Sequence, residues 1–495
     1  MKKQIISFLT VFILLTGNAQ KNYFKPNTVS PSPSMVDYQA MELVGFVHFN
    51  MNTFTDKEWG YGDESEQTFN PTKLNVEQWV KAAKAGGLKE LILTAKHHDG
   101  FCLWPSKFGE HSIKNSPYKN GKGDIVKEFT DACRKYGLKA GLYLSPWDRN
   151  HARYAFPEYI TYYKNQLNEL LTQYGEITEV WFDGANGGDG YYGGAKEKRT
   201  IDSKSYYPWE EIRAIVRKLQ PNAKIFSDAG PDLHWIGNEK GIAGETFWST
   251  FTTSQVIIGQ SGKEPYLNSG DPDGTSWVIG QCDVSIRPGW FFHAKENEAV
   301  KTPAQLVDLY YKSVGRNAVF LLNIPPNREG LFESNDIAAL KGFKTILDET
   351  FAVNLAANAN VKVSNVRGKE KSFVAKNITD NNNQTFWAVD DDETASSFEV
   401  DLTGARLFDR ILLQEPIAYG QRISKFEVQA WVNQQWKTIT AGTTIGFKRL
   451  LRFDPVKSNK IRVQISEFNN TPAISSFAVY KSSPSEMING DIKKK

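Results

Sequence analysis

Apolar runs of strand length alternate with amphipathic helical patterns from about residue 43 to residue 350. This alternation restricts the folds open to the 495-residue chain more than any other feature. We expect strands at residues 44–49, 90–95, 140–144, 179–182, 224–227 and 318–323. Helices are expected between and after them at 76–85, 125–136, 158–174, 209–219, 304–314 and 337–347. Repeated strand–helix units predict a parallel sheet that is covered by helices.

Two arrangements fit such a sheet, a closed (β/α)8 barrel and a doubly wound open sheet. The length of the alternating region favours the barrel. No GxGxxG sequence follows the first strand, as a dinucleotide-binding open sheet would require, and polar residues follow nearly every strand. Barrel enzymes place their active sites at the carboxyl ends of the strands. We therefore predict an α/β fold, a (β/α)8-like TIM barrel over residues 20–350 that carries the catalytic site.

A second domain is predicted after about residue 355, where the pattern changes to alternating strands and turns. Segments 397–402, 410–414, 426–431 and 460–465 have the period of two that is typical of strands with one buried face. We predict a β-sandwich over residues 355–485, with the domain boundary at 351–358.

The amino terminus has the three parts of a signal peptide, which we assign to residues 1–19. Positive residues 1–3 precede an apolar stretch at 5–15 that is too short to cross a bilayer, and small residues lead to Ala19. The protein is therefore expected to be exported, to the periplasm or the medium. We expect no membrane partner. The net charge of +3 is spread along the chain, which does not favour nucleic acid binding.

Asp183 is the first candidate for chemistry, because it ends the apolar run 180–182 and precedes a glycine. A carboxylate just past a buried strand is held rigidly at the rim of the sheet, where it can act as a nucleophile or base. The alternative is an aspartate that caps the following loop.

His97 and His98 follow the predicted strand 90–95, and His48 lies at the end of another strand. Together they allow a metal site or a site that binds sugar hydroxyls. Adjacent residues of an extended segment point in opposite directions, which weakens the metal interpretation. Neutral imidazole both donates and accepts hydrogen bonds, as sugar hydroxyls require. We predict no metal in the active site.

Glu239 and Glu245 are the candidate second carboxylates, each in a loop that carries glycine and tryptophan. A glycosidase needs one carboxyl to protonate the leaving oxygen and another to attack or to activate water. An apolar surrounding keeps the first protonated by raising its pKa. The residues alone do not separate the two glutamates. Further candidates for the pocket are Glu58, Trp59, Tyr143 and Trp290, in a chain with 13 Trp and 20 Tyr.

These segments together resemble glycoside hydrolase family 29, the α-L-fucosidases, over residues 38–348. The motifs are FVHFNMNTF (46–54), EWG (58–60), AKHHDGF (95–101), YLSPW (143–147), VWFDG (180–184), DVSIRPGW (283–290) and LLNIPPN (321–327). The resemblance implies a retaining mechanism with Asp183 as nucleophile. It implies fucose-binding roles for the following residues: His48, Glu58, Trp59, His97, His98, Tyr143 and Trp181.

Segments 235–239 and 287–290 resemble the subgroup that acts on α-1,3 and α-1,4 linkages of fucosylated glycans. The acid/base glutamate of that subgroup closes a Gly-Asn-Glu segment, which selects Glu239 here and leaves Glu245 as the alternative. One departure is Gln281, where the subgroup is expected to have an acid that contacts the leaving group. Two other functions stay open: a sugar-binding protein on a degenerate barrel, and a metal-dependent hydrolase.

Residues 355–485 resemble a discoidin-like (F5/8 type C) β-sandwich through segments 378–380, 385–388 and 414–422. Domains of this kind bind sugar, hold a structural calcium ion or pack against the catalytic domain. The packing role is favoured here, and a calcium site is predicted near Asp380. No other cofactor is expected.

Overall fold

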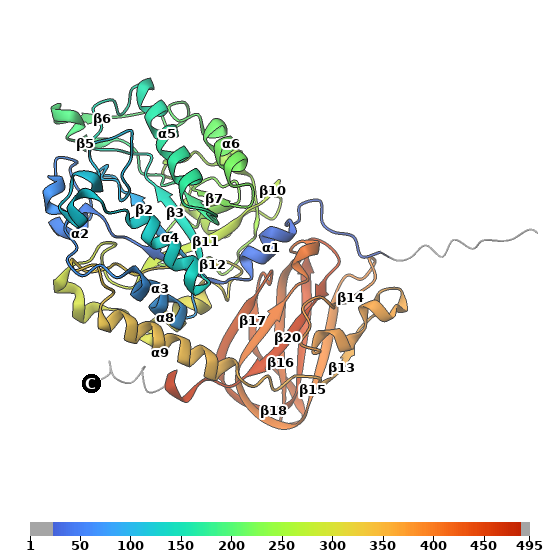
Figure 1. The fold of residues 1–495 in the computed structure, drawn as a ribbon. Helices are drawn as coiled ribbons and strands as arrows, with labels where there is room; N and C mark the ends of the chain where they lie inside the picture. Colours follow the sequence, from blue (N-terminus) through green and yellow to red (C-terminus); the bar gives the residue numbers. More distant parts are fainter. Residues whose placement is uncertain (1–22, 487–495) are drawn as a thin grey trace, which may run out of the picture.

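The protein is described by a computed structural model of residues 23–486, so the predicted signal peptide at 1–19 lies outside the described residues. Eight parallel strands form a closed barrel in the order β1-β12-β11-β8-β7-β4-β3-β2, which confirms the predicted barrel (Figure 1). Their bounds are β1 Leu43–Val47, β2 Glu90–Lys96, β3 Lys139–Leu144, β4 Glu179–Trp181, β7 Lys224–Ser227, β8 Leu233–Trp235, β11 Ile279–Ser285 and β12 Val319–Asn323.

Six of these strands lie where the sequence places them, and two, β8 and β11, were not predicted. β8 follows β7 after five residues with no intervening helix, so it breaks the strand–helix alternation. β11 contains Gln281, Asp283 and Ser285 on alternate positions, and all three are buried inside the barrel region. Polar residues on one face of this strand hide the continuous apolar run that marks the other barrel strands.

Helices cover the outside of the barrel, as the amphipathic patterns predict. They are α3 Val76–Ala85, α4 Ile125–Tyr136, α5 Pro157–Gln173, α6 Trp209–Leu219, α8 Pro303–Lys312 and α9 Ser334–Phe351. The end of α4 shows why they stop where they do. Asp124 accepts a hydrogen bond from the backbone of Lys127, and Gly137 ends the helix in the left-handed region at φ 73°.

Smaller elements join these units. They are α1 Pro33–Gln39, α2 Met51–Thr55, α7 Glu264–Ser269, and two short ribbons that pair β5 Gly188–Gly190 with β6 Glu197–Arg199 and β9 Thr250–Phe251 with β10 Ser276–Trp277. No helix in the described range 23–486 is long and apolar enough to span a membrane.

The C-terminal domain is an antiparallel β-structure, as predicted. Its main sheet contains β13 Asn360–Val363, β15 Ser396–Gln414, β16 Ile423–Val432, β17 Gln435–Gly442, β18 Arg449–Phe468 and β20 Ser476–Tyr480, and β14 Trp387–Ala388 pairs with β19 Ala473–Ile474. The predicted segments 397–402 and 410–414 are parts of the single strand β15. Irregular register between them explains the break in the sequence pattern.

The predicted calcium site lies at a loop of this domain. The Asp380 carboxylate accepts hydrogen bonds from the backbone of Asn382, at 2.9 Å, and from the hydroxyl of Thr385, at 2.6 Å. These contacts satisfy the carboxylate within its own loop. Calcium binding there stays a prediction.

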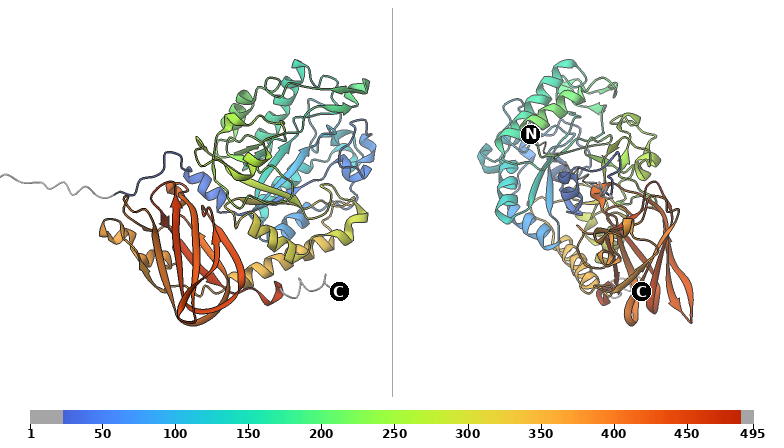
Figure 2. Two further views of the ribbon diagram at one scale, coloured as in Figure 1. Left: turned by 180° about the vertical axis from the view of Figure 1, so that it is seen from behind. Right: turned by 90° about the vertical axis from the view of Figure 1, so that its right-hand side faces the viewer.

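A segment before α1 connects the two domains. Phe24 packs against Phe373, Phe386 and Tyr419 of the sandwich. The backbone N–H of Asn27 donates to the Tyr419 carbonyl at 2.9 Å. The views in Figures 1 and 2 show this segment running along the C-terminal domain before the chain enters the barrel. Residues from 23 onward were assigned to the barrel by sequence, whereas the first of them lie on the other domain.

Candidate active site

One pocket at the carboxyl ends of the barrel strands collects the side chains that the sequence singled out. Its lining residues are Phe46, His48, Glu58, Trp59, His97, His98, Tyr143, Trp181, Asp183, Ala185, Glu239, Asp283 and Trp290. Both first-choice catalytic carboxyls are among them, and so are the seven residues with predicted fucose-binding roles and the further pocket candidate Trp290.

A second lobe adjoins this pocket. The two lobes share Trp181, Asp183, Ala185, Glu239 and Asp283. The second lobe continues along Gly184, Asp228, Trp235, Gly259, Gln260, Ser261, Glu264 and Leu267. The cavity is therefore bipartite, and both candidate catalytic carboxyls lie where its two parts meet.

Asp183 lies two residues past the end of β4, where the Phe182 amide still bonds to the Phe226 carbonyl of β7. Its Oδ1 accepts a hydrogen bond from the Ala185 amide at 2.6 Å. Its Oδ2 accepts one from the Tyr143 hydroxyl at 3.0 Å. The loop-capping contact expected of such an aspartate is thus present, and the second oxygen is left facing the pocket.

His98 lies beside Asp183, with Nε2 at 3.8 Å from Asp183 Oδ2. Its Nδ1 lies 2.7 Å from the Ser145 hydroxyl, which donates its own proton to the Trp147 carbonyl. Nδ1 must therefore carry the hydrogen. Burial lowers the pKa of His98 to about 4, so the ring is neutral at pH 7 and Nε2 is an acceptor.

His48 and His97 complete a set of three neutral imidazoles. The Asn323 amide group donates to Ser285 and to the Trp290 carbonyl, so its oxygen faces His48 Nδ1 at 2.8 Å and fixes the hydrogen there. Burial lowers the pKa of His48 to about 3. Two of the three rings, those of His48 and His98, therefore offer an acceptor Nε2 to the pocket.

The third ring has the opposite tautomer. The Asn52 side chain donates to the Glu58 carbonyl at 3.0 Å and to His97 Nδ1 at 3.3 Å, which leaves the hydrogen of His97 on Nε2. Burial and the neighbouring imidazoles lower the pKa of His97 well below its usual value. The pocket wall thus presents two acceptors and one donor, a pattern suited to hydroxyl groups.

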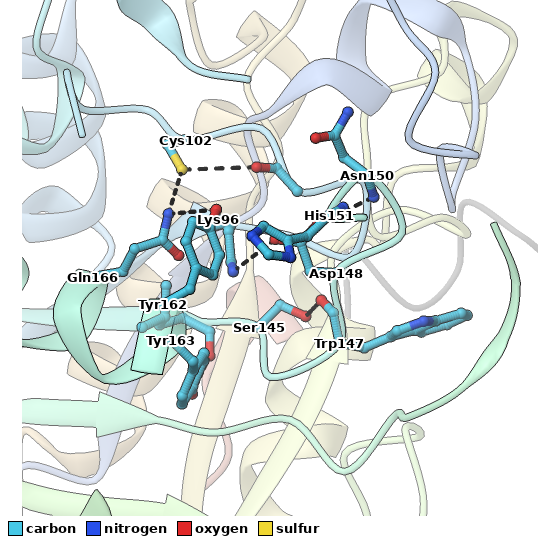
Figure 3. A network of polar contacts seen from close by, with 12 residues as sticks. Lys96, Cys102, Ser145, Trp147, Asp148, Asn150, His151, Tyr162, Tyr163 and Gln166 are labelled. Atoms are coloured by element: carbon cyan, nitrogen blue, oxygen red, sulfur yellow. Dashed lines mark hydrogen bonds and ion pairs between the residues drawn. The ribbon is translucent and has the colours of Figure 1, made fainter. Parts of the chain in front are cut away.

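A buried ion pair lies behind the segment that carries His97 and His98. Lys96 Nζ is 3.1 Å from Asp148 Oδ2 and 3.3 Å from the Tyr159 hydroxyl, and the side chains of both charged residues are almost completely buried. Figure 3 shows Lys96 beside Tyr162 and Tyr163, whose rings also contact the ammonium group. A lone buried charge would be costly, so each of the two charges requires its partner. The pair therefore holds the end of β2, which carries Lys96, against the segment that carries Asp148.

Glu239 lies in the loop after β8, and the Trp290 indole Nε1 donates to its Oε2 at 3.1 Å. Partial burial raises the pKa of Glu239, and the carboxylates of Asp183 and Glu58 add to this effect. The Trp290 hydrogen bond acts in the opposite direction. A carboxyl with a raised pKa keeps its proton to higher pH, which suits a general acid.

Glu245, the alternative acid/base residue, lies where the barrel meets the C-terminal domain. Its carboxylate contacts the guanidinium groups of Arg316 and Arg449, and Arg449 lies on β18 of the C-terminal domain. It is absent from both lobes of the cavity. The structure therefore separates Glu245 from Asp183 and gives it a contact between the domains.

Gln281, at the position where the family resemblance leads us to expect an acid, lies outside both lobes of the cavity. Its Oε1 accepts from the Trp181 indole at 2.9 Å, and its Nε2 donates to Glu179 and Tyr38 at 3.0 and 2.9 Å. These contacts are inside the barrel, below the pocket. The leaving-group contacts that this departure put in question therefore do not involve the Gln281 side chain.

Two residues near the site were not identified from sequence, Asp283 and His293. Asp283 lines both lobes. His293 bridges two carboxylates, with Nδ1 at 2.8 Å from Asp56 and Nε2 at 2.6 Å from Glu58. The Glu58 carboxylate also accepts the Trp290 amide at 2.8 Å. For Asp283 the signal was alternation of polar residues in β11; His293 carried no signal that separates it from an ordinary loop histidine.

Within residues 23–486, no group of three or more His, Cys, Asp or Glu side chains converges in the geometry of a metal site. All three cysteines of the chain are buried and unpaired. Burial raises the pKa of Cys102, so its thiol is not activated as a nucleophile. The titratable side chains that line the pocket are carboxyls, imidazoles and the phenol of Tyr143.

Residues 32–349 match the family described as "Alpha-L-fucosidase", and residues 360–479 match the "F5/8 type C domain". The chain is 42% identical over 493 residues to Alpha-L-fucosidase 1 of Arabidopsis thaliana, which spans 97% of this chain and 94% of the plant protein.

Solved structures give the same result. A glycoside hydrolase 29 family member from an unknown rumen bacterium has 42% identity and a TM-score of 0.83, over 93% of this chain and 80% of that chain. A Ruminococcus gnavus GH29 fucosidase in complex with fucose has 34% identity and a TM-score of 0.83, over 95% of this chain and 98% of that chain. The chain belongs to the α-L-fucosidase family, glycoside hydrolase family 29, and carries a C-terminal F5/8 type C domain.

Proposed function

We propose that the protein releases terminal α-L-fucose from glycans with retention of configuration. Asp183 attacks the anomeric carbon while protonated Glu239 donates its proton to the departing oxygen. Glu239 then takes a proton from water, which attacks the fucosyl–Asp183 intermediate and frees the sugar. The observation that carries this proposal is that the two carboxyls line one pocket in opposite environments.

These environments suit the two roles. The Asp183 carboxylate receives hydrogen bonds from the Ala185 amide and the Tyr143 hydroxyl, and both contacts stabilise its charged form. Glu239 has a raised pKa through partial burial and nearby carboxylates. A carboxyl with a raised pKa beside a hydrogen-bonded carboxylate is a usual basis for dividing acid from nucleophile.

The rest of the pocket suits a deoxy sugar. The acceptors of His48 and His98 and the donor of His97 face hydroxyl groups. Apolar faces are supplied by Phe46, Trp59, Trp181 and Trp290, and we assign the methyl group of fucose to this aromatic side. The solved complex of the R. gnavus relative with fucose supports the choice of sugar.

We assign the second lobe to the leaving group, because it begins at Asp183 and Glu239 and extends away from the sugar pocket. Its polar lining, which includes Gln260 and Ser261, fits a hydroxylated acceptor. We propose α-1,3- and α-1,4-linked fucose as the substrate linkages. Fucose release from a panel of linkage-defined oligosaccharides tests this assignment, and activity restricted to α-1,2 or α-1,6 linkages contradicts it.

The mechanism is tested by azide rescue with an aryl α-L-fucoside. Asp183→Ala is expected to lose turnover and to give, with azide, the fucosyl azide of inverted configuration. Glu239→Ala is expected to give the azide of retained configuration, because azide then attacks the covalent intermediate. Glu245→Ala is the matched control and should turn over without azide. Rescue of Glu245→Ala instead of Glu239→Ala would reverse the acid/base assignment.

Two further assignments complete the proposal. Residues 1–19 direct export and are removed, which mass spectrometry of the mature protein tests directly. The C-terminal domain acts mainly as a support for the barrel. Side-chain contacts from Gln421, Thr444 and Arg449 to residues 245–249 support this role. Full activity of a barrel without that domain would contradict it.

A further inference from the structure

Asp283 is a buried carboxyl that the mechanism above does not use. It lies on β11 between Gln281 and Ser285, with 4% of its surface exposed, and it lines both lobes of the cavity. Its Oδ1 is buried and has no hydrogen-bond partner among the described residues. A buried polar atom without a partner lowers stability, so its retention needs a reason.

The neighbouring position on the same face of β11 gives the contrast. Gln281 is two residues earlier, and every polar atom of its side chain is satisfied by Trp181, Tyr38 or Glu179. Gln281 is therefore a fully paired polar residue inside the barrel. Asp283 is not, and it is the one of the pair that reaches the pocket.

The protonation state of Asp283 follows from its surroundings. Burial raises its pKa well above the usual value, and the nearby carboxyls of Glu239 and Asp183 raise it further. A hydrogen bond from the Trp235 side chain opposes this shift without reversing it. The direction of this shift favours the neutral form of Asp283, which has an O–H group to donate.

We propose that Asp283 is a third active-site carboxyl, which donates a hydrogen bond from its neutral form to a substrate oxygen beside the scissile linkage. This inference rests on the proposed function. The position follows from the shared lining: Asp183, Glu239 and Asp283 all lie where the sugar lobe meets the leaving-group lobe. Asp283 keeps its proton throughout, so it binds substrate without taking part in proton transfer.

The amide of asparagine has the shape of a carboxylic acid and retains a donor, which makes Asp283→Asn the informative variant. It is expected to keep kcat/KM for an aryl fucoside within about tenfold of the unchanged protein. Asp283→Ala lacks any donor and should lose about a hundredfold, comparable to the loss of one aligned donor in an enzyme site.

Thermal unfolding provides a readout that a purely structural role would not give. Because Oδ1 is unpaired, Asp283→Ala should unfold at the same or a higher temperature than the unchanged protein when no sugar is present. The rise in Tm caused by added fucose should be smaller in Asp283→Ala than in Asp283→Asn. Cys282→Ala, at the neighbouring position of β11, changes a side chain that packs with Phe247 and lines neither lobe, so it is the control for changes to β11 itself.

The outcomes separate the possibilities. Wild-type-like activity of Asp283→Ala overturns the proposal, and so does a loss in Asp283→Asn as large as in Asp283→Ala. Unfolding of Asp283→Ala at a clearly lower temperature assigns the residue to structure and also overturns it. Absence of fucose release by the unchanged protein contradicts the proposed function itself, before any Asp283 variant is compared.

Discussion

The Tyr143 hydroxyl donates a hydrogen bond to Asp183 across the mouth of the barrel, from the strand β3 to the second residue after β4. The Tyr143 ring stacks on Trp181 with centroids 5.4 Å apart, so the hydroxyl has little freedom to turn away. The orientation of the Asp183 carboxylate is thus fixed from a neighbouring strand as well as from its own loop.

Loss of this hydroxyl should reduce turnover while leaving the fold intact. A hydrogen bond to a charged group contributes about 1.5–3 kcal/mol, so Tyr143→Phe is expected to lower kcat/KM by about 10- to 150-fold. Tyr163→Phe is the matched control, because it removes a buried hydroxyl that bonds only to the Leu144 carbonyl. Equal effects of the two changes on kcat/KM would contradict a specific role for Tyr143.

The Trp290 indole is expected to set the alkaline limit of activity. Its hydrogen bond lowers the pKa of Glu239. Trp290→Phe keeps an aromatic ring and removes the donor, so the pKa of Glu239 should rise. Because the acid must be protonated to act, the alkaline limb of the kcat/KM profile should move to higher pH. A shift to lower pH, or an acidic-limb change alone, would contradict this.

His293 should make stability depend on pH. Burial alone would lower its pKa, but hydrogen bonds to Asp56 and Glu58 outweigh burial and raise it, with Glu296 adding to the effect. Because the folded pKa lies above the unfolded value of about 6.5, the stabilisation is full below that pH. It is lost as the pH rises through the folded pKa.

The measurement is the Tm of the unchanged protein and of His293→Gln across pH 5 to 9. Glutamine retains one donor but cannot be charged, so the difference in Tm should be largest at low pH and should shrink as the pH rises. Lys295 and Arg328 also lie near Asp56 and are present in both proteins, so they do not alter the trend. A constant difference would contradict the charged bridge.

Gln421 should stabilise the junction between the domains. Its side chain accepts from the Ser249 amide at 2.9 Å and donates to the Phe247 carbonyl at 2.9 Å. Gln421→Ala leaves both backbone groups buried without partners, which costs about 1–3 kcal/mol for each such group. We expect a lower Tm and faster amide hydrogen exchange in residues 239–249, the segment that begins at Glu239. Lys425→Ala, which removes an exposed ion pair with Glu467, is the control.

Chelation tests both predictions about metals. EDTA is expected to leave kcat unchanged, because no proposed step uses a metal. A calcium ion at the Asp380 loop would appear as a fall in Tm on chelation that added Ca²⁺ reverses. Asp380→Ala should abolish that response. Loss of turnover on chelation, restored by a divalent metal, would instead support the metal-dependent alternative.

The sequence predicted those parts of the fold that depend on local pattern. Strands such as β2 and β7 are uninterrupted apolar runs next to amphipathic helices, and their type and position follow from that. β11 was not predicted, because Asp283 and its polar neighbours interrupt the apolar run. When a barrel strand contributes a polar side chain to the pocket, as β11 does with Asp283, that residue interrupts the apolar run by which barrel strands are recognised.

The site shows a similar limit. Asp183 was accessible to sequence reasoning because a single strand end determines its place. Glu239 and Glu245 lie in similar loops with similar neighbours, and only the tertiary contact between Glu245 and Arg449 separates them. His293 acts on Glu58 over 235 positions of sequence, a pairing that no local pattern encodes.

The segment before α1 has a consequence for how the molecule is made. The Asn27 side chain bonds to the Gln421 carbonyl, a partner 394 positions later in the chain. That contact cannot form until almost all of the polypeptide has left the ribosome or the translocation channel. During synthesis the barrel therefore emerges with its first residues unattached, exposing Phe24 to solvent or to chaperones. Docking of this segment marks the completion of the protein, and a chain truncated before residue 420 can never reach that state.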